Sequence, residues 1–375
     1  MVLFAPAIRC SLSADASLSG STYFIIIKGE NFIITPIYSR DYFHGKILGM
    51  SPIDEVPLKE DVQDYYETFN ILVNNKERTI NAVNKRSLLY KLQKKFLNNY
   101  LEHIPLPDCV CGFVKEKNYL DFLIPHCKKK YYLRIDIKDF FNSLKENLVR
   151  DCLSEYIDTP NENEKILDEF ISITTLHGSL PQGAITSPQL SNILMRRIDI
   201  RFRKYCDKFK VQYTRYADDM LFSSDNPEIT KSFFIGKLKD ILKDINLRIN
   251  SKKVIKGKDK IILNGYIVSD KVSLTRKKLK TLNTLLYAFE NNGSKRKYPK
   301  SFIEFKNRLE SVNPNLVDTS KGTARFRVRI INYLAGYRAY LLSLNESSIN
   351  EYTCDFSRKI ERTEKALEIL SSIKL

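Results

Sequence analysis

The clearest pattern of apolar and polar positions surrounds two adjacent acidic residues. Residues 213–224 place apolar and β-prone side chains on both sides of Asp218 and Asp219. This pattern predicts a short hairpin with both carboxylates at its tight turn. A second β-prone run, residues 131–136, ends at Asp136 and leads into a turn and a helix. An acidic side chain in an apolar strand is unfavourable without a compensating partner, which favours a metal site over packing.

The rest of the chain shows mostly helical patterns. A hairpin is expected near the N-terminus, from two β-rich runs at residues 23–27 and 32–37. Residues 178–192 are rich in Gly, Pro, Ser and Thr and predict a loop that opens a helix near Ser187. Helical spacing recurs at residues 62–74, 87–100, 274–291, 301–309, 325–344 and 350–373.

Charge and composition narrow the class of protein. The chain has 375 residues, enough for two or three domains, and 43% of them are hydrophobic. Its 61 Lys and Arg against 44 acidic residues give a net charge of +17, which favours a nucleic-acid partner over a membrane. No stretch approaches the roughly 18 apolar residues of a membrane span. Seven scattered cysteines fit reduced thiols, so we expect a cytoplasmic protein that is not exported.

The acidic pair has two interpretations. Adjacent carboxylates repel each other unless one takes up a proton or a cation lies between them, and hard oxygen ligands suit Mg²⁺. The alternative is a solvated acidic turn, the usual place for such a pair. Lys76 and Arg78, near the start of a strand, are either a solvated basic end or a clasp for a triphosphate. Asp139 could be only a helix cap.

Three motifs together resemble a known family. LRIDIKDFF, LPQGAITSP and YADD, in this order, resemble the polymerase motifs of reverse transcriptases, and the resemblance runs from about Lys76 to beyond Gly265. It implies an α+β right-hand polymerase, with fingers and palm formed by an antiparallel sheet with helices, and a helical thumb. The implied domains are an N-terminal extension of unknown role at 1–65, fingers and palm at 66–270, and a basic thumb at 271–375.

The resemblance also implies roles for individual residues. Asp136 and Asp218 would hold two Mg²⁺ ions, with Mn²⁺ a possible substitute, and Asp219 would complete the cluster. Lys253 would protonate the pyrophosphate, and Phe141 would exclude a ribose 2′-hydroxyl. The nucleotide site would consist of Lys76, Arg78, Asp139, Phe141, Gln182 and Gly183, whose lack of a side chain lets backbone approach a ligand closely. Primer and template would contact Tyr216, Ala217, Leu263, Asn264, Gly265, Tyr266, Lys277, Lys278 and Arg296.

The implied function is RNA-directed synthesis of cDNA from dNTPs, which we expect to copy a structured non-coding RNA in antiviral (anti-phage) defence. Residues 112–126 and YADD look like bacterial retron enzymes and their phage-defence relatives. Residues 121–125 and 263–265 depart from the usual retron pattern, which favours the defence group over a retron enzyme that makes RNA-linked msDNA. Template-independent or protein-primed synthesis, an RNA-dependent RNA polymerase, a nucleotide cyclase and a non-catalytic RNA-binding palm remain alternatives. A protein partner or homo-oligomer is also open.

Overall fold

The computed structural model divides the chain into two compact units. The first comprises Met1–Phe122, Leu133–Phe222 and Glu228–Ile255, and the second comprises Leu123–Tyr132, Ser223–Pro227 and Lys256–Leu375. Arg296 lies outside the described residues, and of Lys76 only the backbone is described. The structure describes residues 23–27, 30–51, 56, 58, 62–73, 76–159, 161–290, 297–318, 320, 322–345 and 351–374.

A four-stranded sheet carries the predicted acidic residues. Its strands are β5 (Tyr131–Asp136), β6 (Gln212–Tyr216), β7 (Asp219–Ser224) and β8 (Ile255–Lys258), in the order β6-β7-β5-β8. The predicted hairpin and the predicted strand ending at Asp136 are both confirmed.

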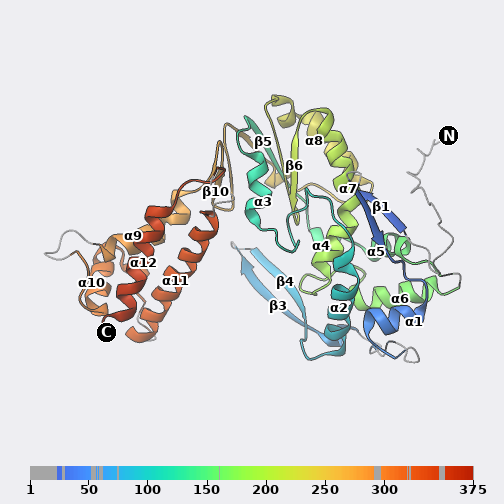
Figure 1. Cartoon of the computed structure of the whole chain (residues 1–375), viewed down its shortest axis with the longest axis horizontal. Coiled ribbons are helices and arrows are strands. Elements are labelled where there is room, and N and C mark those ends of the chain that lie inside the picture. The colour runs from blue at the N-terminus through green and yellow to red at the C-terminus, as the bar shows by residue number, and fades with distance from the viewer. Residues whose placement is uncertain are drawn as a thin grey trace. The chain divides into compact units, whose positions relative to one another are not determined.

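Two helices cover one face of this sheet, α7 (Ser187–Lys208) and α8 (Ser232–Lys243) (Figure 1). The Phe202 ring of α7 meets Tyr213 and Phe222 edge-on, with centroids 5.4 and 5.9 Å away. Phe234 of α8 packs against Phe222 as well. These apolar contacts hold the helices against one face of the sheet. The helix predicted near Ser187 is confirmed, because α7 begins at that residue.

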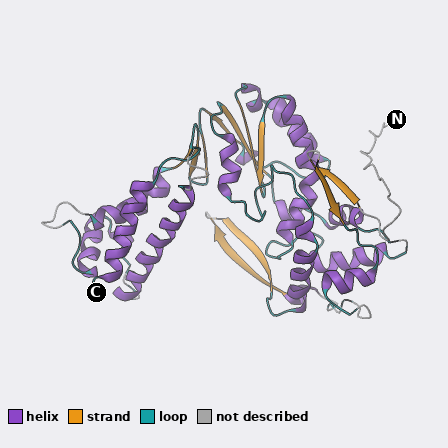
Figure 2. Ribbon diagram, viewed as in Figure 1, coloured by secondary structure: helices purple, strands orange, loops and turns teal. Residues whose placement is uncertain are grey.

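A two-stranded hairpin of β3 (Tyr66–Val73) and β4 (Lys76–Val83) precedes the sheet in the chain (Figure 2). The helix predicted at residues 62–74 is therefore wrong. Tyr66, Phe69 and Leu72 recur at a helical spacing, but eight residue pairs with β4 satisfy the backbone of β3 instead. Local periodicity cannot reveal a pairing partner that lies later in the chain.

The remaining elements of the first unit build its core. The hairpin of β1 (Tyr23–Ile27) and β2 (Glu30–Ile34) and the helix α2 (Leu88–Asn99), which Ser87 caps, confirm their predictions. The centroid of the Phe43 ring lies 6.1 Å from that of Phe96 on α2 and 4.6 Å from that of Phe170 on α6 (Asn163–Thr174). The other helices are α1 (Arg40–Tyr42), a π-helix (Phe43–Leu48), α3 (Tyr119–Leu123), α4 (Phe140–Ser143), α5 (Glu146–Leu153) and α6 (Asn163–Thr174). Single 3₁₀ turns lie at Val62–Tyr65, Leu101–His103, Ile124–His126, Ser154–Tyr156, Pro227–Thr230, Ser251–Lys253 and Pro314–Leu316.

The second unit joins a small sheet to packed helices. Strands β9 (Ile261–Leu263), β10 (Tyr266–Val268) and β11 (Val272–Leu274) are antiparallel in the order β11-β10-β9. The predicted C-terminal helices are confirmed, although the last begins later than expected: α9 (Arg276–Phe289), α10 (Phe302–Val312), α11 (Thr323–Leu344) and α12 (Ser357–Ser372). No helix in the described ranges is long and apolar enough to cross a membrane.

Candidate active site

Three aspartates that are distant in sequence lie on adjacent strands. Asp136 ends β5, Asp218 lies in the β6–β7 turn, and Asp219 begins β7, the neighbour of β5. The backbone N–H of Ile137 donates to the carbonyl of Asp218 over 3.0 Å, which fixes the turn against the end of β5. The sheet therefore brings together the three carboxylates that the sequence singled out.

Two cations and an amide contact these carboxylates. Arg134 lies two residues before Asp136, hence on the same side of β5, and its Nη2 donates to Asp219 Oδ1 and lies 3.5 Å from Asp136 Oδ1. Lys253 Nζ donates to Asp136 Oδ1 over 2.8 Å, and Asn250 Nδ2 to Asp136 Oδ2 over 3.2 Å. Asp136 is only 2% exposed, so these donors compensate a buried charge.

Arg134 and Asn250 are site residues that were not predicted from the sequence. Side chains alternate between the two faces of a strand, so residues two apart share a face. The position of Arg134 two residues before Asp136 on the predicted strand was therefore the signal that could have identified it. Lys253 was assigned to the pyrophosphate, and here its ammonium is paired with Asp136.

The electrostatics of the cluster favour a bound cation. Burial raises the pKa of Asp218, and the charge of Asp136 raises it further. Burial also raises the pKa of Asp219 to about 6, against the opposing effect of Arg134. No set of three His, Cys, Asp or Glu within the described ranges already converges as a metal cage, and Arg134 and Lys253 contact carboxylate oxygens directly. The three carboxylates, which lie together at the ends of adjacent strands, nevertheless form a donor set that fits a hard divalent cation.

The raised pKa of Asp219 predicts that stabilisation of the protein by Mg²⁺ depends on pH. Its folded pKa of about 6 lies above the ordinary aspartate value of 3.8, so its protonated form favours the fold. That contribution is complete below about pH 3.8 and is lost as the pH rises through about 6. We expect Mg²⁺, added to protein freed of metal, to raise the melting temperature more at pH 7.5 than at pH 5. The Asp219→Asn control should narrow this difference, and equal shifts at both pH values in wild type would contradict the assignment.

The residues after Asp136 provide an aromatic wall. Asp139 is the N-cap residue of α4, as one interpretation predicted, but it has a left-handed conformation, φ 47°, and its side chain makes no capping hydrogen bond. Phe140 is buried, whereas Phe141 is half-buried and its ring centroid lies 6.3 Å from that of Phe113. The Phe141 ring therefore packs near Phe113 and remains partly exposed to solvent.

The predicted nucleotide loop contacts β4. The backbone N–H of Asn81 donates to the carbonyl of Gln182 over 2.8 Å. A Cβ on Gly183 would lie 2.6 Å from the Asn81 carbonyl oxygen, so the close approach that Gly183 permits is to a strand of this chain. Arg78 is exposed on that same strand. The structure therefore links the loop of Gln182 to the strand of Arg78.

The remaining predicted residues lie in two turns. Tyr216 packs its ring against Tyr119 and Phe122, with centroids 5.1 and 6.0 Å away, and Ala217 has φ 55°. Leu263, Asn264, Gly265 and Tyr266 form the connection of β9 to β10.

Lys278 supports the second of these turns from within its own unit. Its Nζ lies 4.1 Å from the Tyr266 ring centroid and 4.8 Å from that of Tyr340, and it donates to the Asn264 carbonyl over 3.4 Å. Burial lowers the pKa of Lys278. Lys277, by contrast, is exposed and lines a groove of about 710 Å³ with Arg276, Lys280, Tyr287 and Arg362.

Comparisons with known proteins cover the segment that holds this site. A family model described as reverse transcriptase (RNA-dependent DNA polymerase) matches residues 73–268. The retron Ec83 reverse transcriptase of Escherichia coli is 24% identical over 266 residues, 63% of this chain and 84% of the relative. The retron Ec86 reverse transcriptase of Escherichia coli is 29% identical over 230 residues, 59% of this chain and 69% of the relative.

Solved structures give a weaker match. The apo telomerase of Candida tropicalis aligns with a TM-score of 0.46 and 12% identity, over 85% of this chain and 63% of that chain. The chain thus spans less than two thirds of the telomerase chain.

Proposed function

The chain belongs to the reverse transcriptase (RNA-dependent DNA polymerase) family, and we propose that it copies a dedicated structured RNA into cDNA by two-metal phosphoryl transfer. The observation that carries the proposal is the convergence of Asp136, Asp218 and Asp219 on neighbouring strands, with compensating cations in contact. A pure RNA-binding module gains nothing from a cluster of three acids beside a phosphate backbone.

The residues of the site would have different roles in the reaction. Asp136 and Asp218 would hold the divalent ions, which when bound would activate the primer 3′-hydroxyl and neutralise phosphate charge. Asn250 and Lys253 orient Asp136, while Arg134 orients Asp219. Phosphoryl transfer requires positioning and charge neutralisation more than covalent chemistry, and Arg78 would add a cation at the triphosphate.

Two product classes remain, and the relatives favour one. The Ec83 and Ec86 relatives are retron reverse transcriptases, which supports synthesis of RNA-linked DNA over the other defence-associated group that the sequence departures favoured. Sequence identity to each of these two relatives is below 30%. The structured RNA template and an antiviral (anti-phage) role are therefore parts of our proposal. The site chemistry is the same in either case.

One experiment tests the proposal directly. The protein would be isolated from cells with its nucleic acids, both RNA and DNA would be sequenced, and the Asp218→Asn/Asp219→Asn variant would be compared. We expect one specific RNA in both preparations and a matching cDNA in wild type only. DNA joined to RNA would identify the retron product, and DNA joined to protein would identify protein priming. RNA without new DNA in wild type, under phage challenge as well, would contradict the proposal.

Phe141 predicts the choice of sugar. The family resemblance implies that its ring would lie beneath the incoming sugar. Phe141→Ala should therefore raise ribonucleotide incorporation relative to dNTPs by about tenfold or more, since the clash with the 2′-hydroxyl is removed. Single-nucleotide kinetics with dNTP and NTP would measure the ratio. Phe209→Ala, at an exposed ring, is the matched control. If the variant still synthesises DNA and keeps the wild-type preference for dNTPs over NTPs, then Phe141 does not exclude the ribose 2′-hydroxyl.

The groove of α9 predicts how template–primer binding depends on charge. Lys277→Gln with Lys280→Gln should weaken binding equally for all sequences and lower the slope of log Kd against log salt by about 1 for each phosphate that is no longer neutralised. Lys239→Gln with Lys243→Gln on α8 removes the same charge elsewhere as a control. Weakening confined to particular sequences would contradict a phosphate-binding surface.

A further inference from the structure

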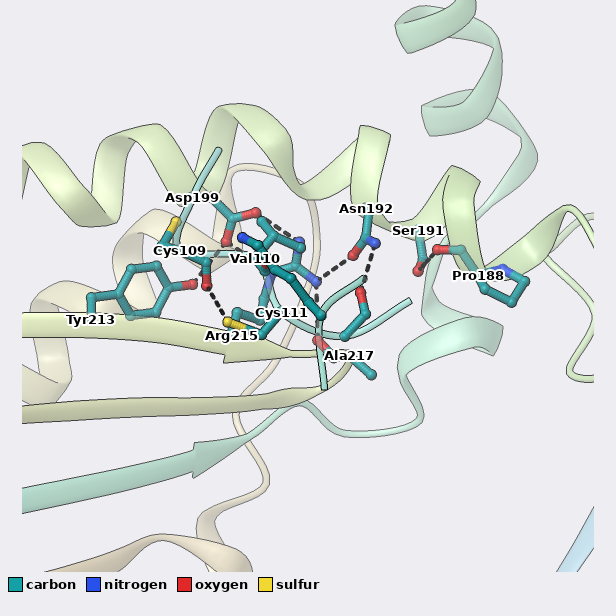
Figure 3. A network of polar contacts seen from close by, with 12 residues as sticks. Cys109, Val110, Cys111, Pro188, Ser191, Asn192, Asp199, Tyr213, Arg215 and Ala217 are labelled. Atoms are coloured by element: carbon teal, nitrogen blue, oxygen red, sulfur yellow. Dashed lines mark hydrogen bonds and ion pairs between the residues drawn. The ribbon is translucent and has the colours of Figure 1, made fainter. Parts of the chain in front are cut away.

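A buried ion pair lies directly behind the YADD turn. Arg215 is the next-to-last residue of β6, and its side chain is fully buried, as is that of Asp199 on α7. Arg215 Nε donates to Asp199 Oδ1 over 2.8 Å, and Nη2 donates to Asp199 Oδ2 over 2.7 Å. Figure 3 shows Asp199 and Asn192 reaching from the helix toward the guanidinium. This two-point pairing holds the guanidinium in one orientation.

The third nitrogen of the guanidinium contacts the turn itself. Arg215 Nη1 donates to the Ala217 carbonyl over 3.1 Å and to Asn192 Oδ1 over 3.0 Å. Ala217 has φ 55°, a left-handed conformation that is unfavourable for a residue with a Cβ. Its carbonyl belongs to the peptide that leads into Asp218. The hydrogen bond from Arg215 therefore acts on the orientation of that aspartate.

Two other segments hold the same turn. Asn192 and Asp199 are seven residues apart on α7, so they share one face, and Asn192 Nδ2 donates to the Gly112 carbonyl over 2.9 Å. A Cβ on Gly112 would lie 2.5 Å from the Ala217 backbone nitrogen. The turn is therefore held by Arg215 through the Ala217 carbonyl, and the Gly112 backbone lies so close to the Ala217 nitrogen that no side chain fits between them.

We propose that Arg215 is a positioning residue that, through the Ala217 carbonyl, sets Asp218 in the orientation it needs beside Asp136. A buried ion pair contributes little net stability compared with apolar side chains of similar volume, so stability alone does not account for its presence. A donor fixed by two bonds to Asp199 and aimed at the turn does account for it. The inference rests on the proposed function, because it takes Asp218 as a carboxylate of the polymerase site.

The test compares three single variants in the full chain. Arg215→Lys keeps the charge opposite Asp199 but lacks the planar fork that also reaches Ala217. Gly112→Ala places a Cβ 2.5 Å from the Ala217 nitrogen, so it displaces the turn while the side chains of Arg215 and Asp199 are kept. For both we expect the rate of single-nucleotide incorporation to fall about 10- to 100-fold and the half-saturating Mg²⁺ concentration to rise, with template–primer Kd unchanged. Tyr213→Phe removes only a bond to Asp199 and should stay within about twofold of wild type.

Folding and activity are measured separately. The melting temperature of each variant, with and without Mg²⁺, reports whether it folds and binds metal, and the Mg²⁺-induced rise should shrink for Arg215→Lys and Gly112→Ala. If Arg215→Lys does not fold, Gly112→Ala decides the question. A folded variant with the wild-type rate and Mg²⁺ requirement would overturn the inference. If wild type is inactive, the proposed function is wrong instead. The Mg²⁺-induced rise in melting temperature would then still test whether Arg215 positions Asp218.

Discussion

An Asp218→Asn variant should incorporate nucleotides at least about 10³-fold more slowly than wild type, a loss of about 4 kcal/mol of transition-state stabilisation. The amide keeps the size of the side chain and one oxygen, but it removes the charge that would hold a divalent ion. Asp136→Asn should give a loss of similar size. Single-turnover incorporation on a defined RNA template with a DNA primer would measure both, and Asp207→Asn, exposed on α7, is the matched control.

Stability separates a defect in chemistry from a defect in folding for this variant. Because burial and Asp136 raise the pKa of Asp218, its ionised form opposes folding at neutral pH. Metal-free Asp218→Asn should therefore be at least as stable as metal-free wild type at pH 7.5, and Mg²⁺ should raise its melting temperature less. A stable variant that retains wild-type activity would contradict the role of Asp218 in the metal site.

The acidic residues could be located from the sequence because their signals are local. Asp136 ends a β-prone run and Asp218 lies between two of them, and both patterns are complete within about a dozen residues. Order along the chain then linked the motifs to one family. The same local evidence failed at Tyr66–Val73, whose apolar spacing fits a helix, because the partner strand β4 decides its structure.

Contacts that support the site could not be predicted from the same signals. Arg215 precedes YADD and is easily taken for one of the many surface cations of a basic chain, yet it is fully buried. Its partner Asp199 lies on α7 beyond the end of the LPQGAITSP motif, and only the packing of α7 on β6 brings the two together. Lys278 and Lys277 are neighbours in the sequence, but helical geometry turns one toward Tyr266 and Tyr340 and the other toward solvent.

Gly183→Ala should damage nucleotide binding more than its small size suggests. The new Cβ would lie 2.6 Å from the Asn81 carbonyl oxygen and 3.1 Å from Ile80 Cγ2, so β4 or the loop must move. Movement would break the hydrogen bond from Asn81 to the Gln182 carbonyl and separate Gln182 from the strand of Arg78. We expect kcat/KM for dNTP to fall about 100-fold, mainly through KM, while template–primer Kd changes little.

Gly178→Ala is the control that isolates the clash. Both glycines have a positive φ, 129° at Gly183 and 68° at Gly178, but a Cβ on Gly178 would meet nothing within 4 Å. It therefore carries only the conformational cost, roughly 1–2 kcal/mol, and should leave the dNTP KM within a few fold of wild type. If Gly183→Ala folds and has the wild-type KM for dNTP, then the contact between β4 and the loop does not position the nucleotide. If both variants lose activity equally, the positive φ would explain the effect and the close contact with β4 would not.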